Sequence, residues 1–124
     1  MKKYTLAELQ KLVDDQTQGR GGYWPEEMIL RHAHKELSEI GEAMDFESGA
    51  LKPKPGQKIP NIPYELADAL YALICFANRR GVDLAQALIE KKGIIEERDK
   101  DRFKKSDKSK PQYGSGRDGG DGDE

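Results

Sequence analysis

The stretch LADALYALICFA, residues 66–77, decides the fold of this chain. Apolar or small residues occupy nearly every position, and a helix that is apolar on all sides is buried on all sides. In a short chain of amphipathic helices, each helix should still expose one face. We therefore expect the face of Tyr71, Ala72 and Cys75 either to form a subunit interface or, alternatively, to contact water.

Three further helices are predicted around this one. Start and stop signals place the four helices at residues 6–16, 25–48, 63–80 and 84–104. Thr5 and Glu8 form a capping-box pattern, and Gly81 is suited to the left-handed position after the third helix. The second helix carries an apolar stripe at helical spacing, made of Leu30, Ala33, Leu37, Ile40 and Met44. No segment alternates like a strand, so we expect an all-α four-helix bundle, completed by oligomerisation as a homodimer or homotetramer.

Composition bounds the class of protein. The 124 residues are 35% apolar and 35% charged, with a net charge of −2, which argues against a nucleic-acid-binding surface. Residues 105–124 have almost no apolar side chains, so we expect a disordered polar tail after a helical domain over residues 1–104. The chain has one cysteine and no long apolar run, so we expect a cytoplasmic protein with no membrane partner.

Two carboxylate pairs border the apolar stripes. Glu36 and Glu39 are three residues apart on the second helix, and Glu65 and Asp68 have the same spacing on the third. Inward-facing carboxylates are costly unless they are paired or bind metal, and an all-oxygen site suits Mg²⁺ or Mn²⁺. To bring the pairs level, the loop after residue 48 must run back along the bundle. The alternative is that these acids form a solvated face.

These residues also carry a resemblance. KELSEIGEA, ELADALYALICFANRRGVDLAQAL and a last helix bearing Lys and Arg resemble the MazG-like, all-α nucleoside triphosphate pyrophosphohydrolase superfamily over roughly residues 25–100. That family has EExxE, a variable spacer and ExxD. The resemblance implies Mg²⁺-dependent hydrolysis of (d)NTPs between the α and β phosphates, giving a monophosphate and pyrophosphate, as in clearing surplus or noncanonical nucleotides.

The chain departs from the family pattern at two places. Lys35 stands where the leading doublet Glu is expected, and Ile95 stands where the last helix usually has Asn. A second register of the motif would use Glu39 and Glu42, which makes Glu42 a second-choice metal ligand. We prefer the register of Glu36 and Glu39, because the apolar positions of the family then coincide with the stripe.

The resemblance and the chemistry together suggest roles for further residues. Glu36 and Glu39 are the predicted catalytic residues, with Glu39 both holding metal and orienting or deprotonating the attacking water. Phosphate binding is predicted for cations of the last helix, Lys91, Lys92 and Arg98, although they also suit a solvated helix end.

Expectations for five other residues follow from their positions. Trp24, the single tryptophan, either stacks on a nucleobase or packs against the core at the start of the second helix. Asn78 either contacts a sugar or caps its helix. His32 and His34 are two apart, make a poor metal pair and are expected at the surface or facing a partner. Cys75 is expected in the core.

Two rival functions remain. One is pyrophosphohydrolysis of another nucleotide, such as phosphoribosyl-ATP or an alarmone. The other is a non-catalytic helical protein that binds partners.

Overall fold

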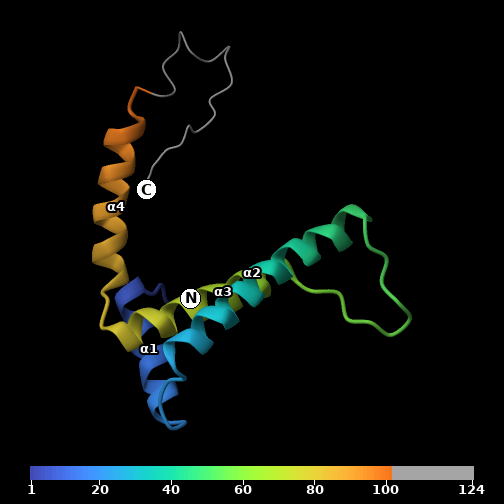
Figure 1. Ribbon diagram of the computed structural model, residues 1–124, viewed down its shortest axis with the longest axis horizontal. Coiled ribbons are helices and arrows are strands. Elements are labelled where there is room, and N and C mark those ends of the chain that lie inside the picture. Colours follow the sequence, from blue (N-terminus) through green and yellow to red (C-terminus); the bar gives the residue numbers. More distant parts are fainter. Residues whose placement is uncertain (102–124) are drawn as a thin grey trace. The chain divides into compact units, whose positions relative to one another are not determined.

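Helices joined by loops make up the part of the chain that the computed structural model describes, residues 1–101 (Figure 1). The helices are α1 (Leu6–Gln18), α2 (Glu26–Ser48), α3 (Ile62–Arg80) and α4 (Leu84–Asp99). No strand occurs within residues 1–101, so the all-α prediction is confirmed. The predicted tail at residues 105–124 lies outside the described residues.

The helix ends follow local rules. The Thr5 hydroxyl accepts a hydrogen bond from the Glu8 amide at 3.1 Å, and the Glu8 carboxylate accepts one from the Thr5 amide at 2.7 Å, as the capping box predicted. Gly81 adopts a left-handed conformation with φ of 71° after α3, also as predicted. The start of α3 lies one residue earlier than expected, because the Asn61 side chain accepts a hydrogen bond from the Tyr64 amide.

α2 and α3 form an antiparallel helix pair, which Figure 1 shows side by side, with residues 49–61 returning the chain. Alanines predominate among the buried apolar residues, which are Ile29, Ala33, Ala43, Ala69, Ala72, Ile74 and Ala77. Because small side chains let backbones approach closely, the pair is joined by a thin layer that we call the alanine seam, Ala33, Ala43, Ala69 and Ala72.

α1 packs against α3 through a polar network. The Asn78 side chain donates hydrogen bonds to the Gln10 carbonyl and the Tyr23 hydroxyl, both at 3.0 Å. The Gln10 amide group donates to the Asn78 side-chain oxygen and to the Val82 carbonyl, both at 2.9 Å. The Tyr23 hydroxyl in turn donates to Asp14 at 2.6 Å, and burial, with help from Asp14, raises the pKa of Tyr23 to about 12. This network anchors α1 and the loop that follows it.

The end of α1 and the turn after it contact the face of Tyr71, Ala72 and Cys75 within the same chain. Arg20 donates to the Tyr71 hydroxyl at 2.9 Å, and this hydroxyl donates to Gln16 at 2.7 Å. Ala72 is buried, so it does not face open solvent, and Cys75 is half-buried. A subunit interface on this face stays a prediction.

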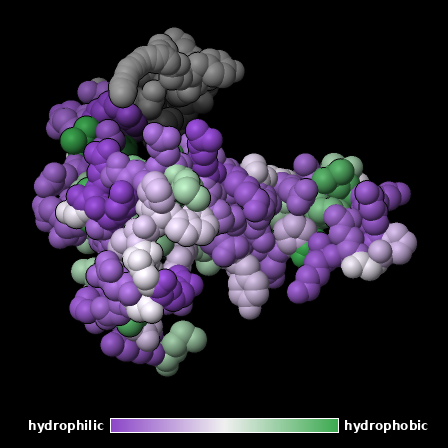
Figure 2. Space-filling view, turned by 60° about the horizontal axis from the view of Figure 1, so that its bottom comes forward, coloured by the Kyte–Doolittle hydropathy of each residue, from purple (hydrophilic) through white to green (hydrophobic). Residues whose placement is uncertain are grey.

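The apolar stripe of α2 is only partly covered by this chain. Ala33 is buried, whereas Leu30, Leu37 and Met44 are 46%, 53% and 56% exposed. On α3, Leu66, Leu70 and Leu73 form a second exposed stripe at helical spacing. Figure 2 shows such hydrophobic side chains, in green, as patches on a mostly hydrophilic surface. The two stripes leave apolar area without a partner in residues 1–101.

The described residues divide into two compact units, Met1–Ala85 and the part from Gln86 onward. The second unit contains most of α4, which has no buried residue. No helix within residues 1–101 is long and apolar enough to cross a membrane.

The polar network yields a stability prediction. We expect Asn78→Ala to lower the free energy of unfolding by about 2 kcal/mol, because it leaves Gln10 and Tyr23 groups without their buried partners. Urea denaturation followed by circular dichroism measures the loss. The neighbouring exposed Arg79→Ala serves as the control, and an equal effect of both variants would contradict the role of the network.

Candidate functional site

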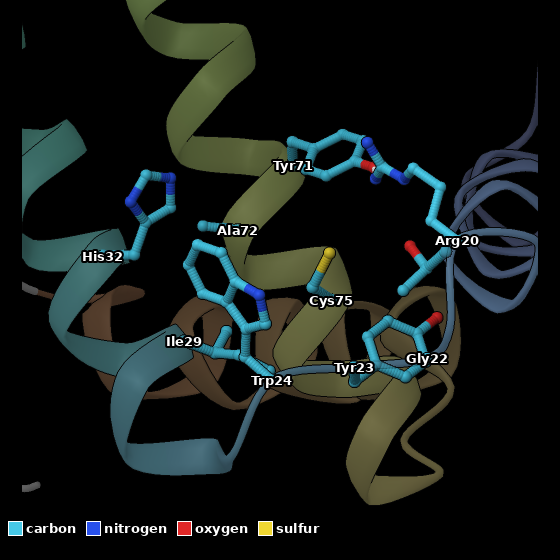
Figure 3. Close-up of a pocket in the computed structure, with 10 residues that line it drawn as sticks. Arg20, Gly22, Tyr23, Trp24, Ile29, His32, Tyr71, Ala72 and Cys75 are labelled. Atoms are coloured by element: carbon cyan, nitrogen blue, oxygen red, sulfur yellow. Dashed lines mark hydrogen bonds between the residues drawn. The ribbon is translucent and has the colours of Figure 1, made fainter.

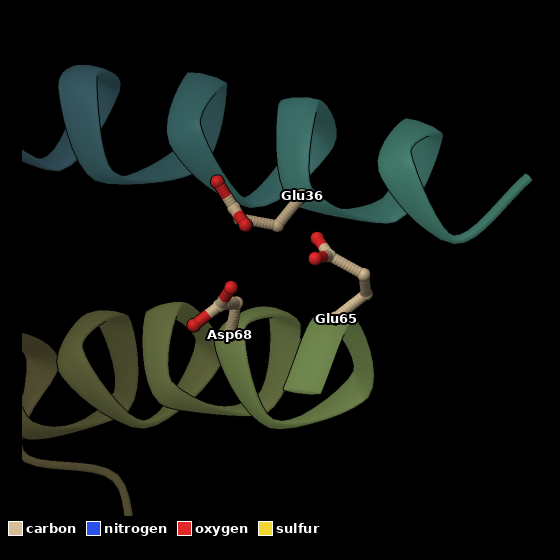
Figure 4. Close-up of side chains that lie close together, drawn as sticks. All are labelled: Glu36, Glu65 and Asp68. Atoms are coloured by element: carbon tan, nitrogen blue, oxygen red, sulfur yellow. The ribbon is translucent and has the colours of Figure 1, made fainter. Parts of the chain in front are cut away.

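Three carboxylates face one another between α2 and α3. Glu36 comes from the middle of α2, and Glu65 and Asp68 come from the first turns of α3 (Figure 4). Each offers an oxygen, and these oxygens all lie within 4.8 Å of one another. The returning loop brings the two pairs level, as expected from its length. We call this group the carboxylate cluster.

The carboxylate cluster brings like charges together at a site that is partly buried. Glu36 is 5% exposed, and one carboxylate oxygen of Glu65, Oε1, is buried without a hydrogen-bond partner in the described structure. Burial raises the pKa of Glu65, and the neighbouring carboxylates of Glu39, Asp68 and Glu36 raise it further. The His32 imidazole lies beside Glu36, with its Nε2 atom 3.6 Å from a Glu36 carboxylate oxygen. It is a cation only when it is protonated. Such an arrangement is stabilised by a bound cation.

The fourth predicted ligand lies at the edge of the cluster. Glu39 is close enough to Glu65 to share a proton with it, yet it falls outside the set of oxygens that converge. Its carboxylate lies 3.8 Å from the Lys35 ammonium. Glu42, the second-choice ligand, is exposed and is not part of the cluster. Glu36, which is a ligand only in the preferred register, is therefore one of the residues whose oxygens lie close together.

The donor set suits a hard divalent cation. All three groups are carboxylates, and oxygen ligands of this kind are preferred by Mg²⁺ and Mn²⁺. The buried Glu65 oxygen that lacks a hydrogen-bond partner has a lone pair that a cation could use. Glu36, Glu65 and Asp68 are the residues that would hold the ion, with Glu39 beside them.

A pocket of about 390 Å³ adjoins the cluster (Figure 3). It is lined by the end of α1, the loop after it, α2 and α3. His32 lies one turn before Glu36 on α2, and Ala72 lies one turn after Asp68 on α3, so the pocket begins one helical turn from the carboxylates.

Trp24 lines this pocket. Its side chain is 56% exposed, and its ring meets the His32 ring edge-on, with centroids 5.9 Å apart. Of the two readings for this residue, packing in the core is excluded by its exposure. An exposed indole on a pocket wall can stack on a flat ring.

The histidines and the cysteine were expected in different settings. His32, expected at the surface or facing a partner, has a 42% exposed side chain and also lines the pocket beside Trp24. His34 is exposed. Cys75 was expected in the core, but it is half-buried, because its side of α3 faces the pocket.

The remaining predicted binding residues lie away from the pocket lining or on α4. Asn78 is not among the pocket residues, and its amide group is used in the network with Gln10 and Tyr23. Lys91, Lys92 and Arg98 lie exposed on α4, where Lys92 pairs with Glu96 and Arg98 with Asp99. Phosphate binding by these three cations stays a prediction.

Sequence reasoning missed part of the pocket. Thr17, Arg20, Tyr23 and Tyr71 line it, yet none was a candidate. Tyr23 and Trp24 directly follow the glycine-containing turn of residues 19–22, and this arrangement was a sequence signal for a ligand-binding turn. The local pattern gave no indication that the turn would lie against α3.

Comparisons with known proteins agree with this fold. No protein-family model matches the chain. The chain is similar to YpjD of Bacillus subtilis (strain 168), an uncharacterised protein, with 25% identity over 111 residues that span 89% of this chain and all of YpjD. It is also similar to the crystal structure of YpjD from Bacillus subtilis, described there as a candidate pyrophosphatase. That match has a TM-score of 0.62 and 26% identity, and covers 78% of this chain and 95% of the other.

The cluster predicts opposite effects of one substitution with and without metal. Without metal, we expect Glu65→Gln to leave the melting temperature unchanged or to raise it, because it removes one of several like charges. With Mg²⁺ or Mn²⁺, the parent protein should gain melting temperature and the variant should gain much less.

Thermal unfolding with and without millimolar metal checks this. Glu47→Gln, at an exposed acid near the end of α2, is the matched control and should keep the metal response. Equal metal responses of parent and Glu65→Gln would contradict binding at the cluster.

Proposed function

We propose that the protein is a metal-dependent pyrophosphohydrolase of nucleoside triphosphates. It would use Mg²⁺, with Mn²⁺ as a substitute, and would cleave (d)NTPs between the α and β phosphates to give a monophosphate and pyrophosphate. The observation that carries the proposal is the carboxylate cluster of Glu36, Glu65 and Asp68, one helical turn from a pocket bordered by an exposed tryptophan. The similarity to YpjD, a candidate pyrophosphatase, supports the same reaction class.

The pocket and the cluster suit the two ends of a nucleotide. An aromatic wall at Trp24 offers a stacking surface for a base. The carboxylates one turn away would hold the cation that accompanies a polyphosphate. The substrate would therefore lie along the α2–α3 pair, with its base in the pocket and its phosphates at the cluster.

Each residue has a defined part in the reaction. A bound divalent cation supplies charge neutralisation for the phosphates and lowers the pKa of water. Glu36, Glu65 and Asp68 hold the cation, and their negative charge keeps the site specific for it. Glu39, at the edge of the cluster, orients the attacking water and accepts its proton. Lys91, Lys92 and Arg98 are proposed to contact phosphate oxygens.

The oligomer is a second part of the proposal. The exposed stripes of α2 and α3 carry large aliphatic side chains, such as Leu37 at 53% and Leu70 at 44% exposure. A helix pair joined mainly by alanines buries little apolar area by itself, and a second copy would cover the stripes. We propose a homodimer as the minimal assembly.

A nucleotide panel tests the reaction. Purified protein with Mg²⁺ should convert at least one (d)NTP to its monophosphate and release pyrophosphate rather than orthophosphate. Ion-exchange chromatography identifies the products, and phosphoribosyl-ATP and an alarmone belong in the panel as rival substrates. Absence of turnover of every nucleotide would favour the non-catalytic alternative.

Substitutions in the cluster should remove this activity. We expect Glu36→Gln and Asp68→Asn each to lower kcat/KM by about 100-fold or more, because each removes a ligand of the cation. Circular dichroism should show both variants folded. A larger loss for Glu42→Gln than for Glu36→Gln would move the ligand set to the second register.

The dimer proposal has its own test. Leu37→Glu should convert the assembly to monomers, because it places a charge in the apolar contact. Size-exclusion chromatography with light scattering measures the mass. Leu12→Glu on α1, with a similar exposure of 50%, is the control. A parent protein that is monomeric at all concentrations would refute the dimer.

A further inference from the structure

The pocket has a polar wall that the proposed hydrolysis leaves unused. Thr17 near the end of α1 and Arg20 in the turn after it contribute this wall. The Tyr71 hydroxyl accepts a hydrogen bond from the Arg20 guanidinium at 2.9 Å and donates one to Gln16 at 2.7 Å. These bonds place the exposed Arg20 side chain at the pocket.

The Thr17 side chain has no partner of its own. Thr17 is 6% exposed, and its hydroxyl makes no hydrogen bond in the described structure. Burial raises the pKa of the Cys75 thiol, and the nearby Thr17 hydroxyl and Arg20 charge offset part of that rise. Both polar groups thus lie beside Cys75, and a neutral thiol is a weak hydrogen-bond partner.

Thr17 lines the pocket, but its hydroxyl oxygen is itself covered and does not open onto the pocket. The hydrogen-bond donors that a ligand would meet at this wall are therefore those of Arg20.

Arg20 has hydrogen-bond donors to spare. A guanidinium has five N–H donors and no acceptor, and Arg20 makes no ion pair within residues 1–101. In the view of Figure 3, Trp24 and His32 lie on one side of Cys75 and Arg20 on the other. A flat ligand in this pocket would have an aromatic face on one side and, at its edge, donors that require acceptor atoms.

The position of the wall indicates which edge of a base it meets. Cys75 lies seven residues beyond Asp68 on α3, or about 10 Å along the helix axis at 1.5 Å per residue. With the phosphates at the carboxylate cluster, the sugar spans the first part of this distance. The edge of the base that is far from the sugar then reaches Thr17 and Arg20.

We propose that Arg20 selects bases with a carbonyl oxygen on that far edge, so that guanine and uracil nucleotides bind in preference to adenine and cytosine nucleotides. The inference rests on the proposed function, because it takes the pocket as the base site of that reaction. Guanine O6 and uracil O4 accept hydrogen bonds, whereas the amino groups of adenine and cytosine donate them. An adenine or cytosine amino group facing Arg20 would place its hydrogen-bond donors opposite those of the guanidinium, with no acceptor between them.

Trp24 fluorescence tests this without catalysis. Trp24 is the single tryptophan of the chain and lines the pocket, so its emission should report titration with GMP, UMP, AMP and CMP in the full-length protein. We expect GMP and UMP to bind about tenfold more tightly than AMP and CMP, as for one good arginine–base contact. Calorimetry with the same four ligands checks the affinities.

Two variants assign the preference to Arg20. Arg20→Gln should bring the four affinities to within about twofold, whereas Arg79→Gln, an exposed arginine outside the pocket, should keep the preference. Both variants should keep the melting temperature of the parent protein, because both side chains are exposed. A variant that lost binding through misfolding would lower the melting temperature instead.

The outcomes separate the inference from the proposed function. Equal binding of the four monophosphates, tighter binding of AMP, or a preference that survives Arg20→Gln overturns the inference, even if (d)NTPs are hydrolysed. No binding of any of the four overturns it as well. A preference for GMP and UMP that Arg20→Gln abolishes supports it, and absence of pyrophosphate release in the same preparation would then count against the proposed function alone.

Discussion

The mutual repulsion of Glu36, Glu65 and Asp68 is the constraint on which the rest of the structure depends. Two helices must approach closely enough to hold these carboxylates within 4.8 Å, although like charges favour separation. The alanine seam provides the close approach, and the loop of residues 49–61 sets the register that puts the middle of α2 opposite the start of α3. Without metal, the helix pair is therefore held together against its own charges.

The local features of the fold could be predicted from the sequence. The capping box at Thr5, the glycine at position 81 and the two carboxylate pairs depend on neighbours within a turn or two, where residue chemistry decides the outcome. The length of the loop after residue 48 was enough to predict that the two carboxylate pairs lie at the same height along the α2–α3 pair. Glu36 was identified in this way, because three-residue spacing beside an apolar stripe has few structural solutions.

Contacts between distant segments could not be predicted. Tyr71 meets Gln16 and Arg20, which lie 55 and 51 residues away, and no periodicity encodes such a pairing. The same docking of α1 created the pocket and drew His32 and Cys75 into it. The exposure of Leu30, Leu37 and Met44 was missed for another reason: apolar periodicity indicates that a face is covered, but it does not indicate which chain covers it.

The alanine seam also acts as a gauge of ionic size. The buried positions of the α2–α3 pair are mostly alanines, so few long side chains could adjust if the helices moved apart. We therefore expect an ion with longer bonds to oxygen, such as Ca²⁺, to fit between Glu36 and Asp68 less well than Mg²⁺ would. Discrimination between cations would then depend on buried methyl groups that are not ligands.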